Sequence, residues 1–160
     1  MLTIIFMEED QVDVVPHDDD PVVVSIIPMG RRVHKVLIDQ GNSANVIFWD
    51  AFVGLGVPLD QMCPFDDVLV WLACDHMEVR GYTDLRTTFL DGEAAKTIVV
   101  WYIVVKALSS YNILTGRPSL NRLEAVVSTA HLKMKFPADT GHIVTLRVDQ
   151  AVAQKCYENS

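Results

Sequence analysis

The feature that most constrains the fold is a series of short apolar runs, rich in β-branched residues, that recur with turn residues between them. Runs of this length suit strands and are too short for long helices. The runs that we predict as strands lie at 22–27, 33–39, 68–72, 77–81, 85–90, 95–105, the residues leading to Gly116, 132–136 and 143–148. Short strands at this spacing predict an all-β barrel or sandwich rather than a βαβ fold.

Two hairpins and two short helices complete the predicted order. A turn at Gly30 separates the first two runs, which we expect to pair, and the third and fourth runs predict a second hairpin. Residues 48–56 predict a short helix that ends at its glycines. A second helix has Pro118 in its first turn, where a missing N–H costs nothing. In the run 132–136, strict alternation places Lys133 and Lys135 on the outer face.

The composition is that of one globular domain whose partners are not nucleic acids. Half of the 160 residues are hydrophobic and 21% are charged. The formal net charge is −8 and no basic stripe is present, which argues against a nucleic-acid partner. No run reaches the roughly 18 apolar residues of a membrane helix, so no membrane partner is expected. We expect an acidic lead-in at 1–21, a domain at 22–148 and a tail at 149–160.

The cysteines give no sign of a disulfide framework or a metal centre. Their number is odd, three, and no C-x-x-C occurs among Cys63, Cys74 and Cys156. This pattern favours a reducing, intracellular and cytoplasmic setting, and the first ten residues lack the basic region of a signal peptide. We expect neither a metal nor a cofactor.

Asp39 is the main candidate for a catalytic residue. It directly follows the apolar residues 36–38 and is followed, two residues later, by Gly41. A carboxylate at the end of a buried strand can point out of the scaffold into a cleft. It can also be a turn-forming aspartate with no further role, because Asp favours turns.

Two candidate nucleophiles, a serine and a cysteine, have less support from the sequence than Asp39 has as a catalytic acid. Ser43 lies in "GNSAN", where Asn45 replaces the second glycine of the G-x-S-x-G elbow, so Ser43 is better explained as a turn residue near Asp39. Cys74 lies two residues from His76 in the tip of the second predicted hairpin, which is better explained as an exposed loop.

Three longer blocks carry a resemblance to a known family. They are "VLIDQGNSANVIF" at 36–48, "SSYNILTGRPSLN" at 109–121 and "AVVSTAHLKMKFP" at 125–137. In this order they resemble the retropepsin type of aspartic protease, most closely the protease segment of plant Gypsy-type LTR retrotransposon polyproteins. The resemblance implies a closed or partly open acid-protease barrel with one or two short helices.

The resemblance also implies an activity and a set of roles. The chain would be an aspartic endopeptidase, active as a homodimer at mildly acidic pH, that cleaves a retrotransposon polyprotein. Two copies of the catalytic Asp39 would share one proton and activate a water molecule. The resemblance implies three groups of residues around this pair of aspartates. They are an active-site loop (Gln40, Gly41, Ser43 and Ala44), a flap tip that covers the substrate cleft (Leu72, Ala73, Cys74 and Asp75) and a second structural loop (Thr115, Gly116 and Arg117).

Three positions depart from the family pattern. Gln40 stands where the family usually has Thr or Ser, whose hydroxyl bonds across the dimer axis. Thr115 stands where an apolar residue is usual, and the flap tip at 72–75 contains no glycine. These departures leave an alternative, a catalytically inactive retropepsin-like module that dimerises or has a structural role.

Overall fold

The structure is a computed structural model that describes residues 4, 21–63, 77–92 and 94–148. Within these ranges the chain is mostly β, as the sequence predicts. The strands are β1 (Val23–Pro28), β2 (Val33–Ile38), β3 (Asn45–Phe48), β4 (Glu78–Asp91), β5 (Ala94–Lys106), β6 (Ile113–Thr115), β7 (Val126–Ser128), β8 (Lys133–Pro137) and β9 (Ile143–Arg147). The helices are α1 (Trp49–Gly54), α2 (Arg117–Leu123) and the 3-10 turn η2 (Leu59–Gln61). No helix among the described residues has the length and apolar character needed to cross a membrane.

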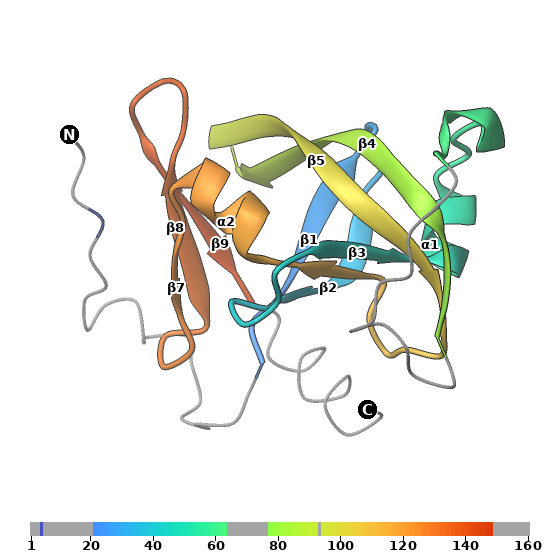
Figure 1. The fold of residues 1–160 in the computed structure, drawn as a ribbon. Coiled ribbons are helices and arrows are strands. Elements are labelled where there is room, and N and C mark those ends of the chain that lie inside the picture. Colours follow the sequence, from blue (N-terminus) through green and yellow to red (C-terminus); the bar gives the residue numbers. More distant parts are fainter. Residues whose placement is uncertain (1–3, 5–20, 64–76, 93, 149–160) are drawn as a thin grey trace.

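Six strands close into a barrel in the order β1-β2-β6-β3-β5-β4, with β4 returning to β1 (Figure 1). The first predicted hairpin is confirmed, because β1 and β2 pair antiparallel. The short strand β6 lies between β2 and β3, parallel to β2 and antiparallel to β3. The carboxyl ends of β2 and β6 and the start of β3 therefore meet at one end of the barrel.

The long strands β4 and β5 fill the barrel interior with alternate side chains. On β5, Tyr102 is 1% exposed, whereas its neighbour Trp101 is 48% exposed. The Tyr102 hydroxyl lies 3.0 Å from Thr87 Oγ1 on β4, so this buried polar group has a partner. Burial raises the pKa of Tyr102 far above its usual range, and the hydrogen bond with Thr87 offsets only part of this effect. The phenol is therefore a neutral core group.

Strand β4 differs from the sequence prediction of two separate strands at 77–81 and 85–90. Pairing with β5 continues through 82–84, where Thr83 lies opposite Tyr102. The register shifts between Val79 and Gly81, so the strand bends at a bulge instead of ending. A Cβ on Gly81 would lie 2.4 Å from the carbonyl oxygen of Cys63, which shows why the bend needs glycine there. The other half of the predicted second hairpin, 68–72, lies outside the described residues.

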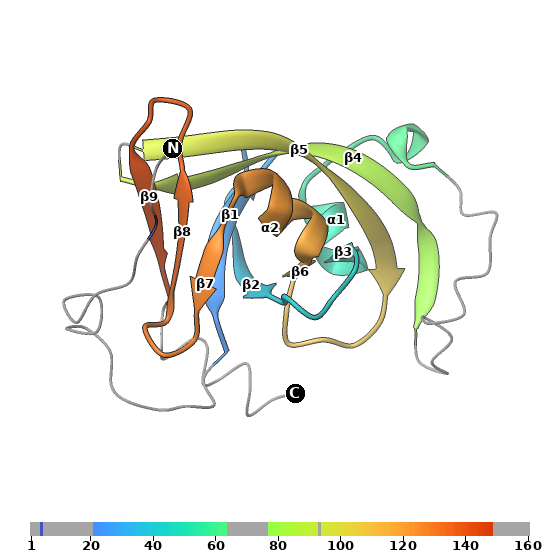
Figure 2. The same cartoon turned by 60° about the vertical axis from the view of Figure 1, so that its left-hand side comes forward.

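A three-stranded antiparallel sheet, β7-β8-β9, and helix α2 lie beside the barrel (Figure 2). As predicted, Pro118 is in the first turn of α2. Phe136 of β8 faces inward and meets the ring of Phe89 edge-on, with centroids 6.1 Å apart. The outward position predicted for Lys133 is wrong, because the residue is only 4% exposed. β8 is the central strand, and cross-strand neighbours flank Lys133 on both sides.

Candidate functional site

Asp39 directly follows β2, and its own loop holds it in place. Its backbone N–H donates to the carbonyl oxygen of Thr115 over 2.9 Å, which ties the residue to β6. The N–H of Gly41 donates to Asp39 Oδ1 over 3.1 Å, and the N–H of Asn42 donates to the Asp39 carbonyl over 3.2 Å. These bonds form a compact turn that fixes a half-buried carboxylate at the end of the barrel.

The other predicted members of this loop differ in what they contribute. Gln40, Gly41 and Ser43 are exposed, and Ala44 is half-buried. The predicted support of the carboxylate comes from the Gly41 backbone, because Asp39 Oδ1 accepts from that N–H and no hydrogen bond of Ser43 is formed among the described residues. A Cβ on Gly41 would meet only Asp39 Oδ1, at an ordinary 3.5 Å. Within one chain, a side chain at position 41 would therefore cause no steric clash, so steric crowding does not explain the glycine.

Gly116 allows the second loop, 115–117, to pack closely against the first loop, 39–44. A Cβ on this residue would lie 2.2 Å from the carbonyl oxygen of Ala44 and 2.7 Å from that of Asn42. The next residue, Arg117, donates its backbone N–H to the Asn42 carbonyl over 2.9 Å. The structure thus brings together the loops predicted from residues 39–44 and 115–117, with the Thr115 side chain buried and Arg117 exposed.

Asn45 is a structural residue of this site that the sequence reasoning did not identify. It is 4% exposed, and its Oδ1 accepts from the Gly116 N–H at 2.9 Å and from Ser119 Oγ at 3.0 Å. Its Nδ2 donates to the Trp101 carbonyl over 3.4 Å. One side chain therefore joins β3, α2, β5 and the second loop. The sequence signal was a single amide at the start of the apolar run 46–48, since a buried amide needs partners.

Replacing Asn45 by alanine is expected to lower the free energy of unfolding by about 2 to 3 kcal/mol, because it leaves buried donors without an acceptor. Urea denaturation followed by circular dichroism measures this change. Asn121→Ala is the matched control, since Asn121 is exposed on α2. Equal stability of the two variants would show that the Asn45 bonds do not hold the loops together.

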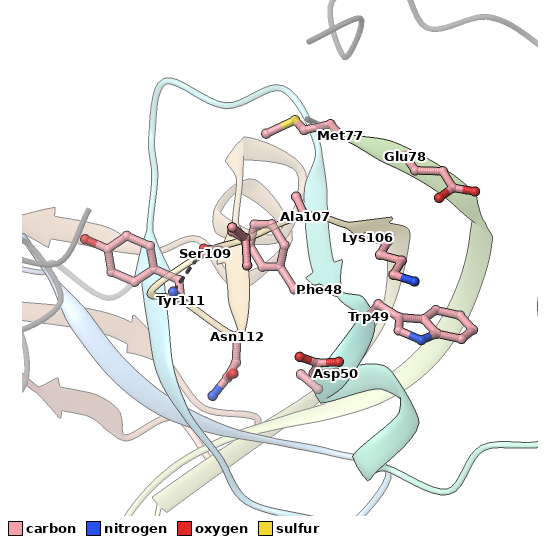
Figure 3. Close-up of a pocket in the computed structure, with 12 residues that line it drawn as sticks. Phe48, Trp49, Asp50, Met77, Glu78, Lys106, Ala107, Ser109, Tyr111 and Asn112 are labelled. Atoms are coloured by element: carbon pink, nitrogen blue, oxygen red, sulfur yellow. Dashed lines mark hydrogen bonds between the residues drawn. The ribbon is translucent and has the colours of Figure 1, made fainter. Parts of the chain in front are cut away.

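A cleft near the end of β3 and the start of β6 consists of two adjoining cavities of about 510 and 600 Å³. Both are lined by Phe48, Met77 and Tyr111, together with the exposed Leu108. The charged lining residues of the smaller cavity are Asp50, Glu78 and Lys106 (Figure 3). The cleft can therefore receive an apolar group and offers polar contacts at one side.

Register connects this cleft with Asp39. Leu37 and Leu114 lie opposite each other on β2 and β6, and both line the larger cavity. Side chains alternate along a strand, so Asp39 shares the side of β2 on which Leu37 lies. The carboxylate and the apolar cleft therefore face the same side. The predicted flap tip, 72–75, lies outside the described residues.

The described residues contain no group of three or more His, Cys, Asp or Glu side chains placed to hold a metal ion. The site offers a carboxylate, that of Asp39, two residues after Leu37, which lines the apolar cleft. A carboxylate in this setting can take a proton from water or share one with a second acid.

Comparison with known proteins supports the fold. No family model matches the sequence, and no curated protein matches it. The fold is similar to that in the crystal structure of the retroviral protease-like domain of Ddi1 from Leishmania major, with a TM-score of 0.58 and 13% sequence identity. The match covers 81% of this chain and 94% of that chain. The predicted retropepsin-like barrel with short helices is therefore confirmed as a fold.

Proposed function

We propose that this chain is an aspartic endopeptidase of the retropepsin type that hydrolyses peptide bonds as a homodimer. The observation that carries the proposal is the position of Asp39. Its carboxylate is fixed at the end of β2 by the Gly41 N–H, on the side of the strand where Leu37 lines an apolar cavity. A carboxylate held at this position can act as the general base that activates a water molecule for peptide hydrolysis.

In the proposed reaction, Asp39 from each of two copies shares a single proton, because two adjacent carboxylates resist ionising together. The ionised carboxylate takes a proton from water, whose oxygen forms a bond to the peptide carbonyl carbon. The protonated carboxyl donates a hydrogen bond to the carbonyl oxygen and polarises it. Collapse of the tetrahedral species breaks the C–N bond as the amine receives a proton, without a covalent enzyme intermediate.

The homodimer follows from the number of candidate acids. Asp39 is the Asp-x-Gly aspartate that directly follows the apolar run 36–38 and is bound to β6 through its backbone N–H. Two other Asp and Gly pairs lie in turns between paired strands. Asp91 and Gly92 lie between β4 and β5, where Gly92 has φ +59, and Asp139-Thr140-Gly141 lies between β8 and β9, where Gly141 has φ +88. A second carboxylate would come from a second copy across a two-fold axis, which is an isologous arrangement.

The proposed substrate is a polypeptide with an apolar side chain near the cleaved bond. Phe48, Tyr111 and Leu114 supply apolar walls to the cleft, and burying such a side chain there contributes binding free energy. We propose a plant Gypsy-type retrotransposon polyprotein as the natural substrate, processed in the cytoplasm. The support is the likeness of the blocks at 36–48 and 109–121 to that protease segment.

The activity is tested by incubating the full chain with a peptide library between about pH 4 and 6.5, where carboxyl dyads work, with and without a statine-type inhibitor. Cleavage that the inhibitor blocks supports the peptidase. A dimer that cuts nothing supports the inactive module instead. A chain that stays monomeric at high micromolar concentration contradicts both dimeric functions.

One observation favours the inactive module as the second candidate. Gln40 is exposed in the single chain, at the position where the family usually has a hydroxyl residue. An amide is longer than a hydroxyl and does not fit the same reciprocal bond across the dimer axis. The dimer would then persist through other contacts while the two Asp39 loops are held less firmly.

Gln40→Thr is expected to tighten the dimer by about 10-fold or more, because two symmetric hydrogen bonds contribute roughly 0.5 to 1.5 kcal/mol each. Analytical ultracentrifugation over a concentration series measures the dissociation constant. Gln40→Val is the matched control, since it has the shape of threonine without the hydroxyl. If the valine variant tightens the dimer equally, the effect comes from side-chain size and the hydrogen-bond explanation is wrong.

A further inference from the structure

A second hollow, of about 350 Å³, lies on the outer side of the barrel, and four of its ten lining residues are basic. Arg32, His34 and Lys35 come from the β1–β2 hairpin, and Arg147 comes from the end of β9. Asp91 is the one acidic residue among its lining residues. We call this hollow the cationic groove. It shares no lining residue with the two cavities of the cleft beside Asp39.

A β-bulge explains why two basic residues that are neighbours in sequence both line the groove. Val24 lies opposite Val36, whereas Ile26 lies opposite Val33, so β2 holds one extra residue between these pairs. The extra residue breaks the alternation of side chains, and both His34 and Lys35 are exposed. Without the bulge, these two neighbours would point to opposite faces of the strand.

Hydrogen bonds to β1 and to Asn112 hold the part of β2 that contains His34 and Lys35. His34 Nδ1 lies 2.7 Å from Ser25 Oγ on β1, and the His34 carbonyl accepts from Asn112 Nδ2 over 2.8 Å. Lys35 has φ +57, a conformation that is uncommon for a residue with a side chain, and its carbonyl accepts from the Asn112 N–H over 2.9 Å. The hairpin thus holds adjacent basic side chains at one place on the surface.

Charge is divided unevenly along the chain. The described residues contain twelve Lys and Arg and eight Asp and Glu, a net charge of +4. Residues 1–20 contain seven Asp and Glu and no Lys or Arg, a net charge of −7. Opposite charges on a single chain attract at an effective concentration set by the tether.

The tether is short enough for the acidic segment to reach the groove. Asp20 is three residues before Val23, which itself lines the groove. An extended chain spans about 3.3 to 3.6 Å per residue, so the aspartates at 18–20 begin within about 10 to 18 Å of Val23. The aspartates at 18–20 can therefore reach the groove within the same chain.

We propose that the cationic groove binds the acidic residues 18–20 of the same chain. The groove is then an intramolecular docking surface that fixes how the lead-in segment approaches the barrel. The contact is electrostatic, between the carboxylates of the segment and the basic groups of Arg32 and Lys35. It does not depend on the proposed peptidase activity, since it lies away from the cleft.

Zero-length carbodiimide crosslinking of the full chain tests the contact, because the reagent joins a carboxylate and a lysine amine only when they touch. We expect Lys35 to be joined to Asp18, Asp19 or Asp20 with at least about fivefold the yield of Lys106. Lys106 is the matched control, being exposed at the other cavity. Raising salt from about 0.02 to 0.5 M is expected to lower the Lys35 yield several-fold. Equal yields at the two lysines would overturn the proposal.

Mixing unlabelled with nitrogen-15-labelled chains identifies the occupant. Crosslinks whose two halves carry the same label support docking within one chain, whereas mixed-label crosslinks at the statistical proportion would overturn it in favour of a second copy. Arg32→Gln should lower the Lys35 yield about threefold and speed cleavage after Glu9 by a glutamate-specific protease. Arg86→Gln, an exposed residue on β4, should change neither measurement. No difference between these variants would also overturn the proposal.

Discussion

Replacing Asp39 by asparagine is expected to lower the rate of peptide hydrolysis by at least about 10³-fold and to leave the fold intact. The proposed reaction needs a carboxylate that takes a proton from water, a role that typically contributes a factor of about 10² to 10⁴ and that an amide cannot perform. Asparagine keeps the acceptor oxygen that the Gly41 N–H contacts at 3.1 Å, so the turn is preserved. The variant therefore separates chemistry from folding.

Steady-state kinetics on the best peptide from the library measures this change, and circular dichroism with sedimentation verifies the fold and the dimer. Asp139→Asn is the matched control, because Asp139 begins the chain's other Asp-x-Gly, is exposed after β8 and is remote in sequence from both active-site loops. Cleavage that persists in Asp39→Asn would contradict the proposed peptidase. A similar loss in both variants would point to an effect on solubility or stability and not to catalysis.

The strand end and the turn at Asp39 could be predicted from the sequence because their signal is local. An apolar run that stops at a carboxylate, with a glycine two residues later, predicts a strand followed by a tight turn. The structure has β2 ending at Ile38 and the turn closed by bonds of Gly41 and Asn42 to Asp39. The predicted helix start at Pro118 has the same local character, since it depends on the fixed backbone of proline.

The features that the sequence did not predict arise from contacts between distant segments. Asn45 meets Gly116, 71 residues away, and no pattern around residue 45 indicates that partner. β4 is continuous because β5 pairs with it along its whole length, which includes Asp84, a residue type that is depleted in strands. Lys133 is buried because β8 is central in its sheet, an arrangement that alternation alone does not determine.

Gly116→Ala is expected to destabilise the protein by about 3 kcal/mol or more, at the upper end of the range for inserted carbon atoms. The added Cβ would lie 2.2 Å from the Ala44 carbonyl oxygen and 2.7 Å from the Asn42 carbonyl oxygen. Both obstacles are backbone atoms of the loop that carries Asp39, so neither can rotate away as a side chain would. Relief requires the two loops to separate, which also breaks the bond from the Gly116 N–H to Asn45 Oδ1.

Thermal and urea unfolding of the full chain measure the loss, with Gly54→Ala as the matched control. A Cβ on Gly54 would meet nothing within 4 Å, and alanine favours the helix in which Gly54 lies, so that variant should be neutral or more stable by about 0.5 to 1 kcal/mol. Equal stability of the two alanine variants would mean that the loops tolerate separation. Because the loops at 39–44 and 115–117 are packed backbone to backbone, we expect instead that folding and the placement of the Asp39 carboxylate fail together.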